Sequence, residues 1–213
     1  MTLEEFLSKY STALFTLAGA LLGALASFLT ASVMAQKEIR LRLREKLLDR
    51  RIEAHEHVID LSHSMRAMRP LGGLDAEGEL ARAPAVFISK EVFDDWLNHF
   101  YQTMTTTSTW LGMSLIHELN LLQDYVVNLN EFLQQVPTEN YQRVGQIIRL
   151  DFIHFSDSIE KLAFEFFTND LEKLRISRLP KWHKYPLKET EKRIRNTDLF
   201  KHRDELQALV RAK

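Results

Sequence analysis

The stretch TALFTLAGALLGALASFLTASVMA, residues 12–35, decides the fold, because its 24 residues carry no charge. As an α-helix it spans about 36 Å at 1.5 Å per residue, whereas the hydrocarbon core of a bilayer is about 30 Å thick. The stretch therefore predicts a single transmembrane helix. Thr2 and Glu5 have the spacing of a capping box, so we expect this helix to begin near Leu3.

A cleavable signal peptide is the main alternative, because Val33, Met34 and Ala35 fit a small-residue cleavage site. Two features oppose it: the apolar stretch exceeds the usual ~7–15 residues, and an acidic segment precedes it. Between residues 37 and 51 there are seven Lys or Arg against three acids. The positive-inside rule keeps such a cluster in the cytoplasm. We expect a single-pass protein of the inner (cytoplasmic) membrane, with its N-terminus outside and its C-terminal domain in the cytoplasm.

Small residues recur every four positions within the apolar stretch and line one face of the predicted helix. They let helix backbones approach closely in lipid, where packing drives association. The spacing predicts self-association into a homo-oligomer; the alternative is that Gly and Ala are simply common in membrane helices. The residues of this transmembrane packing face are Gly19, Gly23, Ser27 and Ala31.

Residues 37–69 are predicted to continue the helix as a basic amphipathic stem, because no Gly or Pro interrupts the chain between Gln36 and Met68. Apolar residues repeat along the stem with coiled-coil-like spacing. Arg44 and Arg51 interrupt the repeat at its membrane end, so the seam either joins two chains or packs on the stem's own domain. The stem seam consists of Leu47, Ala54, Val58, Leu61, Met65 and Met68.

The rest of the chain predicts a helical domain. Hydrophobic residues make up 45% of the sequence, enough for a core, while 7 Gly and 5 Pro are too few for a turn-rich β architecture. The absence of cysteine excludes disulfides and thiolate metal sites. We expect an all-α fold. Its parts are a tail and transmembrane helix over 1–36, the stem, a loop over 70–88, an antiparallel helical bundle over 89–174, and a basic arm with a short helix over 175–213.

Charge is strongly segregated along the chain, although the net charge is only −1. Residues 52–172 carry seven basic against nineteen acidic groups, and residues 173–213 carry thirteen basic against five acidic groups. The cations and aromatics of the arm fit a solvated linker, docking on an acidic protein surface or anionic lipid; nucleic acid is the weakest of the four interpretations. This basic interfacial or docking patch consists of Arg175, Arg178, Lys181, Trp182, Lys184, Tyr185 and Lys188.

Two carboxylate–histidine pairs at i, i+3 spacing are candidates for a metal site: Asp60 with His63, and Asp151 with His154. Bundles that bind two metal ions use Glu-x-x-His instead, with ligands pointing into the core. Asp60 and His63 share a face of the stem away from its seam, which favours a solvated surface. The sequence also has no nucleophile elbow and no glycine-rich phosphate loop. We therefore expect no metal, no cofactor and no enzymatic activity.

The layout of a short anchor, a basic stem and a small helical cytosolic domain is similar to that of many bacterial single-pass proteins, including membrane effectors of phage-defence systems. This similarity is one of architecture and carries no residue roles. We expect a self-associating module in the lipid bilayer that presents its domain to a cytosolic protein partner. The alternatives are a membrane-perturbing effector held inactive by a partner, and a bundle metalloprotein.

Overall fold

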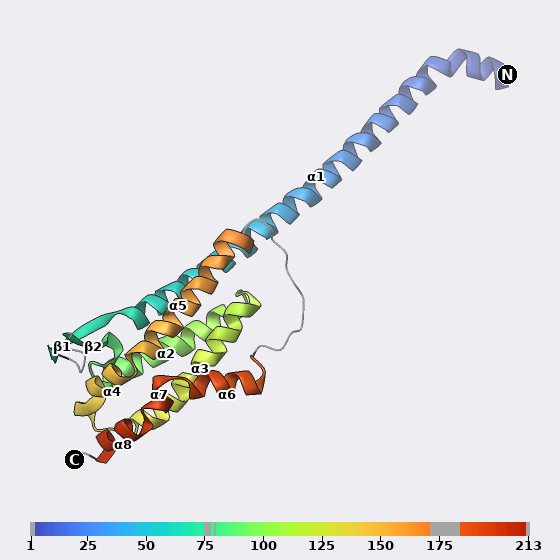
Figure 1. Ribbon diagram of the computed structural model, residues 1–213. Helices are drawn as coiled ribbons and strands as arrows, with labels where there is room; N and C mark the ends of the chain where they lie inside the picture. The colour runs from blue at the N-terminus through green and yellow to red at the C-terminus, as the bar shows by residue number, and fades with distance from the viewer. Residues whose placement is uncertain (1–2, 75–77, 79, 171–183, 212–213) are drawn as a thin grey trace. The chain divides into compact units, whose positions relative to one another are not determined.

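The computed structural model describes residues 3–74, 78, 80–170 and 184–211 of the chain (Figure 1). Most of these residues are helical, as the sequence predicts, and a small two-stranded hairpin is present as well. By its internal contacts the chain divides into two compact units, residues 1–49 and residues 50–213.

The first helix, α1, runs from Leu3 to Arg66 without interruption. This confirms that the apolar stretch and the stem form one helix, which ends three residues earlier than the predicted residue 69. Pro70 explains why the helix stops, because proline has no N–H to donate and pushes the residue before it into extended backbone. The chain enters a β-strand at Met68.

In the first unit, every side chain from residue 15 to residue 31 is exposed. This part of α1 includes a segment that is long and apolar enough to cross a membrane, and none of that segment is buried. Apolar surface on this scale is normally removed from water. The large exposed apolar side chains of the segment are Phe15, Leu17, Leu21, Leu22, Leu25, Phe28, Leu29, Val33 and Met34.

The second unit begins within α1 and continues through shorter helices. Residues 108–112 reverse the direction of the chain between the first two of these helices (Figure 1). The helices are α2 (Lys90–Thr107), α3 (Met113–Leu133), α4 (Tyr141–Ile147), α5 (Arg149–Glu165), α6 (Leu187–Arg195), α7 (Asp198–Lys201) and α8 (Arg203–Arg211). Short helical turns lie at η1 (Ala85–Phe87), η2 (Thr138–Asn140) and η3 (Phe166–Asp170).

A hairpin stands where a loop over 70–88 was expected, so the all-α prediction is wrong at this point. Strands β1 (Met68–Leu74) and β2 (Leu80–Pro84) pair antiparallel, with Met68 opposite Pro84 and Leu74 opposite Leu80. In β2, Ala81 and Ala83 are buried and alternate with exposed Arg82, which is the period of a strand with one covered face. The alternation is too short, and alanine too poor a strand former, for the sequence to reveal it.

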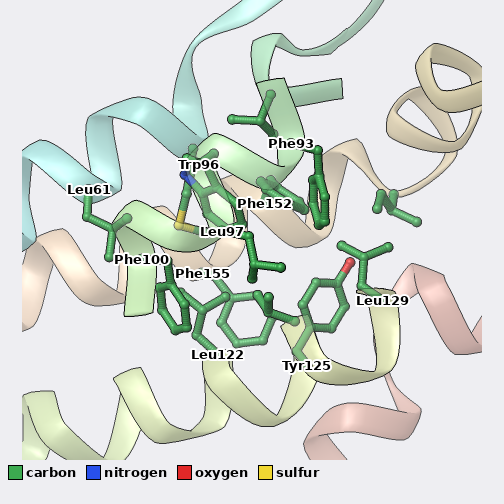
Figure 2. Close-up of a cluster of buried hydrophobic side chains, with 14 of the residues drawn as sticks. Leu61, Phe93, Trp96, Leu97, Phe100, Leu122, Tyr125, Leu129, Phe152 and Phe155 are labelled. Carbon is green, nitrogen blue, oxygen red and sulfur yellow. The ribbon is translucent and has the colours of Figure 1, made fainter. Parts of the chain in front are cut away.

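The core of the second unit gathers aromatic and aliphatic side chains from the end of α1 and from α2, α3 and α5 (Figure 2). Trp96 of α2 packs against two other rings of this core: the ring centroids of Phe100 and Phe152 are 5.9 and 5.6 Å away. Edge-to-face and offset aromatic pairs at such distances add to the stabilisation from burial. The Trp96 indole N–H donates to the Ser64 hydroxyl at 3.0 Å, which ties α2 to α1.

The stem seam packs within this chain. Ala54, Val58, Leu61 and Met65 are 0–3% exposed and belong to the core of the second unit, so this part of the seam has no free face for another chain. Met68 is half-buried, and Leu47, half-buried too, falls in the first unit. The sequence left open whether the seam joins two chains or packs on its own domain. In the structure, residues 54–65 pack on their own domain.

Polar contacts fix the same part of α1. The Arg66 guanidinium reaches two carboxylates of α5, Asp157 at 2.5 Å and Glu160. Near the start of the second unit, Arg51 lies 4.6 Å from the ring centroid of Phe166 and donates to the Trp110 carbonyl at 3.3 Å. Arg51 interrupts the apolar repeat but still packs against the domain, because a guanidinium stacks well on an aromatic face.

Gly145 of α4 provides a test of how tightly the core is packed. A Cβ at this position would lie 2.7 Å from Cβ and Cγ of Phe87. Alanine favours a helix by about 1 kcal/mol over glycine, but overpacking a core costs about 1–3 kcal/mol. We expect Gly145→Ala to lower the free energy of unfolding by up to about 2 kcal/mol, measured by urea denaturation of the full chain in mild detergent.

Gly112 is the matched control, because a Cβ there meets nothing within 4 Å and its φ of −70° suits any residue. Gly112→Ala should change the free energy of unfolding by less than about 1 kcal/mol. A Gly145→Ala variant at least as stable as the wild type would contradict the close packing of α4 on Phe87.

Candidate functional site

The described part of the basic arm, residues 184–211, is joined to the helical domain through a buried carboxylate of α3. Glu118 is 2% exposed. Arg193 of α6 donates to both of its oxygens, from Nη1 at 2.8 Å and from Nη2 at 2.6 Å, and the Tyr185 hydroxyl donates at 3.0 Å. A bidentate arginine–carboxylate pair is among the strongest hydrogen-bonded pairs in proteins. The Arg193 guanidinium also lies 5.0 Å from the Tyr185 ring centroid.

A second buried carboxylate, Asp151 of α5, receives the next helix of the arm. It is 4% exposed and accepts hydrogen bonds from the backbone N–H groups of Asp198 at 2.7 Å and Leu199 at 3.0 Å. These are the first residues of α7, and the preceding Thr197 makes no side-chain cap of its own. Asp151 therefore caps α7 from another helix, where a carboxylate satisfies N–H groups that have no partner within the helix. The Tyr125 hydroxyl donates to the same carboxylate at 3.0 Å.

Burial and hydrogen bonding shift the pKa values of three groups in these contacts: Asp151, Tyr185 and Arg193. Burial raises the pKa of Asp151, while the N–H groups of Asp198 and Leu199 act to lower it. Burial and the nearby charge of Glu118 raise the pKa of Tyr185. Burial works to lower the pKa of Arg193, but its hydrogen bonds and charge attraction to Glu118 outweigh burial and raise that pKa. Arg193 and Tyr185 thus keep their protons, so both remain donors to Glu118.

A cleft of about 230 Å³ lies where α3, α5 and α6 meet. Glu118, Asp151 and Arg193 line it together with His154 and Ser158. The two carboxylates already accept hydrogen bonds from the arm, so they act as docking points and not as free acids. The chemistry of this site is therefore recognition of a basic, tyrosine-containing segment by an acidic surface.

Only part of the predicted basic patch belongs to this arrangement. Lys184 pairs with Asp124 of α3 at 2.9 Å, Tyr185 binds Glu118, and Lys188 is exposed. Lys184 and Tyr185 therefore contact acidic side chains of α3 within this chain. The remaining members of the patch lie outside the described residues: Arg175, Arg178, Lys181 and Trp182.

The metal candidates do not come together. Asp60 and His63 are exposed on α1, and His63 lies 3.5 Å from Glu160. Asp151 is occupied by its three donors, and His154 is exposed. Across the described residues, no three His, Asp or Glu side chains gather in a way that would hold a metal ion.

The predicted transmembrane packing face lies in the first unit. Gly19, Gly23, Ser27 and Ala31 are all exposed. A Cβ at either glycine would meet nothing within 4 Å, so the backbone at these two positions is uncovered in the single chain. Four of the seam residues, Ala54, Val58, Leu61 and Met65, belong instead to the core of the second unit.

The sequence did contain a signal for the two buried carboxylates. Glu118 follows Leu115 by three residues and precedes Leu122 by four, so it shares a helix face with them. Asp151 stands in the same relation to Ile148 and Phe155. A carboxylate inside an apolar stripe requires a hydrogen-bonding partner, and the arm holds the cations, but sequence spacing does not reveal which cation lies opposite.

Comparisons with protein-family models, with curated proteins and with solved structures find no match to this chain.

Arg193→Met tests whether the arm depends on the pair with Glu118. The change leaves a carboxylate whose side chain is 3% exposed without its counter-charge, and an unpaired buried charge is costly. Because the Arg193 side chain is 35% exposed, we expect a loss of about 1–3 kcal/mol in the free energy of unfolding of the full chain, measured in detergent.

Two further variants show whether the loss of stability comes from breaking the buried pair. Glu118→Gln combined with Arg193→Met removes the unpaired negative charge and should recover part of the lost free energy of unfolding. A double-mutant cycle measures this recovery. Lys184→Met breaks a more exposed pair and should cost less than about 1 kcal/mol. Equal effects of Arg193→Met and Lys184→Met would show that the buried pair has no special role.

Proposed function

We propose that this chain is a membrane-anchored, self-associating helical module whose folded domain faces the cytoplasm and binds a protein partner. The observation that carries the proposal is the long apolar face of α1, which no described residue of the chain covers. Burying a Leu or Phe side chain is worth about 1.5–3 kcal/mol, so a helix with this many exposed apolar side chains is stable only in a non-aqueous environment. A bilayer provides that environment.

The orientation rests on the charges that follow the apolar segment. Lys37, Arg40, Arg42, Arg44 and Lys46 come directly after it, and the positive-inside rule places them in the cytoplasm. The second unit follows them in the chain and would lie on the same side. The N-terminal residues would then lie outside.

Self-association is supported by the backbone left open at Gly19 and Gly23. In lipid, small residues at i, i+4 allow a second helix to approach and to gain dispersion contacts along the stripe. The stem seam is packed within its own chain at residues 54–65, so the small-residue face of the apolar segment is the better candidate for the contact between copies.

The second unit supports a role in binding and not in catalysis. Its buried carboxylates, Glu118 and Asp151, hold the arm in place. A groove of about 440 Å³ between α3, α7 and α8 presents Phe132 and Phe200 beside Glu131 and Arg203. A lining that mixes aromatic, polar and charged side chains is compatible with protein binding.

Gly19→Leu combined with Gly23→Leu tests the self-association. Two leucines fill the space that a second backbone would occupy, so we expect the monomer–oligomer equilibrium in membranes to shift toward monomer by on the order of tenfold. Chemical crosslinking in membranes and sizing in mild detergent measure the shift.

Ala18→Leu is the matched control, because Ala18 lies on the opposite side of the helix from the small-residue face. It should leave the oligomer unchanged. A wild-type chain that is strictly monomeric in membranes, or an oligomer indifferent to the paired leucines, would refute self-association through this face.

A further inference from the structure

The part of α1 that follows the apolar segment combines exposed cations with exposed apolar side chains. Lys37, Arg40 and Arg44 are all exposed, and none of them forms an ion pair with a described residue. In contrast, Arg42 pairs with Glu38 at 2.6 Å. Ile39, Leu41 and Leu43 are 56–59% exposed within the same segment.

These cations form one stripe. Lys37, Arg40 and Arg44 are spaced i, i+3 and i+7, which places them on a single face of the helix within about 60° of one another. Ile39 and Leu43, at i and i+4, share a different face. In water the exposed apolar side chains of this segment would be unfavourably hydrated. At the boundary between a bilayer and water, both the cations and the apolar side chains find a suitable environment.

We propose that Lys37, Arg40 and Arg44 bind the headgroups of anionic phospholipids in the cytoplasmic leaflet. This inference rests on the membrane anchor proposed above and names the lipid class that the anchor recognises. Ile39 and Leu43 lie in the interfacial layer between acyl chains and headgroups, on the neighbouring face.

The direction of the helix favours this contact. Side chains of an α-helix lean toward its N-terminus, and here the N-terminal side is the bilayer. Lys37 and Arg44 are about 10 Å apart along the axis, so both long side chains reach toward the same headgroup layer. Arginine pairs with a phosphate through two parallel hydrogen bonds, which suits it to a phosphodiester headgroup.

The chain has no cysteine, so Gln36→Cys offers a unique attachment point for a fluorophore next to the stripe. The labelled full chain is reconstituted in vesicles that contain phosphatidylcholine and phosphatidylglycerol, with bromine on the acyl chains of one lipid at a time. Because each Lys or Arg near the surface favours anionic lipid about fivefold, we expect brominated phosphatidylglycerol to quench far more than its molar share. The readout is independent of orientation, because both leaflets contain both lipids.

Three comparisons make the result specific. Lys37→Gln, Arg40→Gln and Arg44→Gln together should bring the two quenchers close to equality, as should about 1 M salt, where the Debye length is about 3 Å. Arg40→Lys with Arg44→Lys keeps the charge and should retain most of the preference. Arg69→Gln, Arg82→Gln and Arg143→Gln remove three exposed cations of the second unit and should leave the preference unchanged.

Each other outcome has a defined meaning. Equal quenching of the wild type by both lipids overturns the lipid preference and leaves the anchor intact. Quenching by neither lipid overturns the anchor and the lipid preference together. A preference that survives the three Gln substitutions assigns lipid selectivity to another part of the chain and overturns the role of this stripe.

Discussion

The exposed apolar surface of α1 is the constraint on which the interpretation of the whole chain depends. From Phe15 to Met34 the helix presents large apolar side chains that no described residue covers. Hydration of such a surface is unfavourable in proportion to its area, and only lipid or other apolar helices relieve it. The proposed orientation, the proposed contact between copies and the proposed lipid preference all depend on which environment covers this surface.

The same helix supplies part of the core of the second unit. Ala54, Val58, Leu61 and Met65 are packed into the second unit, and the helix continues without a break from the apolar segment to these residues. An anchor joined to a domain by a continuous helix has no flexible linker sequence between the two. Association of anchors would therefore also bring domains together, which is a useful property in a module that binds a partner.

Charge segregation has a structural role in the second unit. The acidic helices and the basic arm meet at Glu118, where Arg193 and Tyr185 supply the hydrogen bonds, and at Asp151, which caps α7. Because buried carboxylates are costly without partners, the arm completes the domain. The net charge of −1 conceals this complementarity, which becomes visible only when the charges are counted by segment.

The sequence predicted the elements with strong periodicity and missed those fixed by long-range contacts. The uncharged stretch and the stem without Gly or Pro together predicted the continuous helix α1. The strands Met68–Leu74 and Leu80–Pro84 were missed, because a Gly- and Pro-rich segment of low strand propensity pairs only when the domain covers Ala81 and Ala83. Asp151 was a candidate metal ligand by spacing alone, because spacing reveals residue type and face. Its partners in the structure come from α3 and α7, far apart in sequence.

Labelling of single cysteines in intact cells directly tests the proposed membrane anchor and its orientation. Ser8→Cys and Thr138→Cys each introduce one thiol into a chain that has none, and a membrane-impermeant maleimide reports which side of the membrane each occupies. We expect Ser8→Cys to be labelled in intact cells and Thr138→Cys only after lysis, with the chain resistant to alkaline carbonate extraction. Release of the chain by carbonate, or labelling of Thr138→Cys in intact cells, would contradict it.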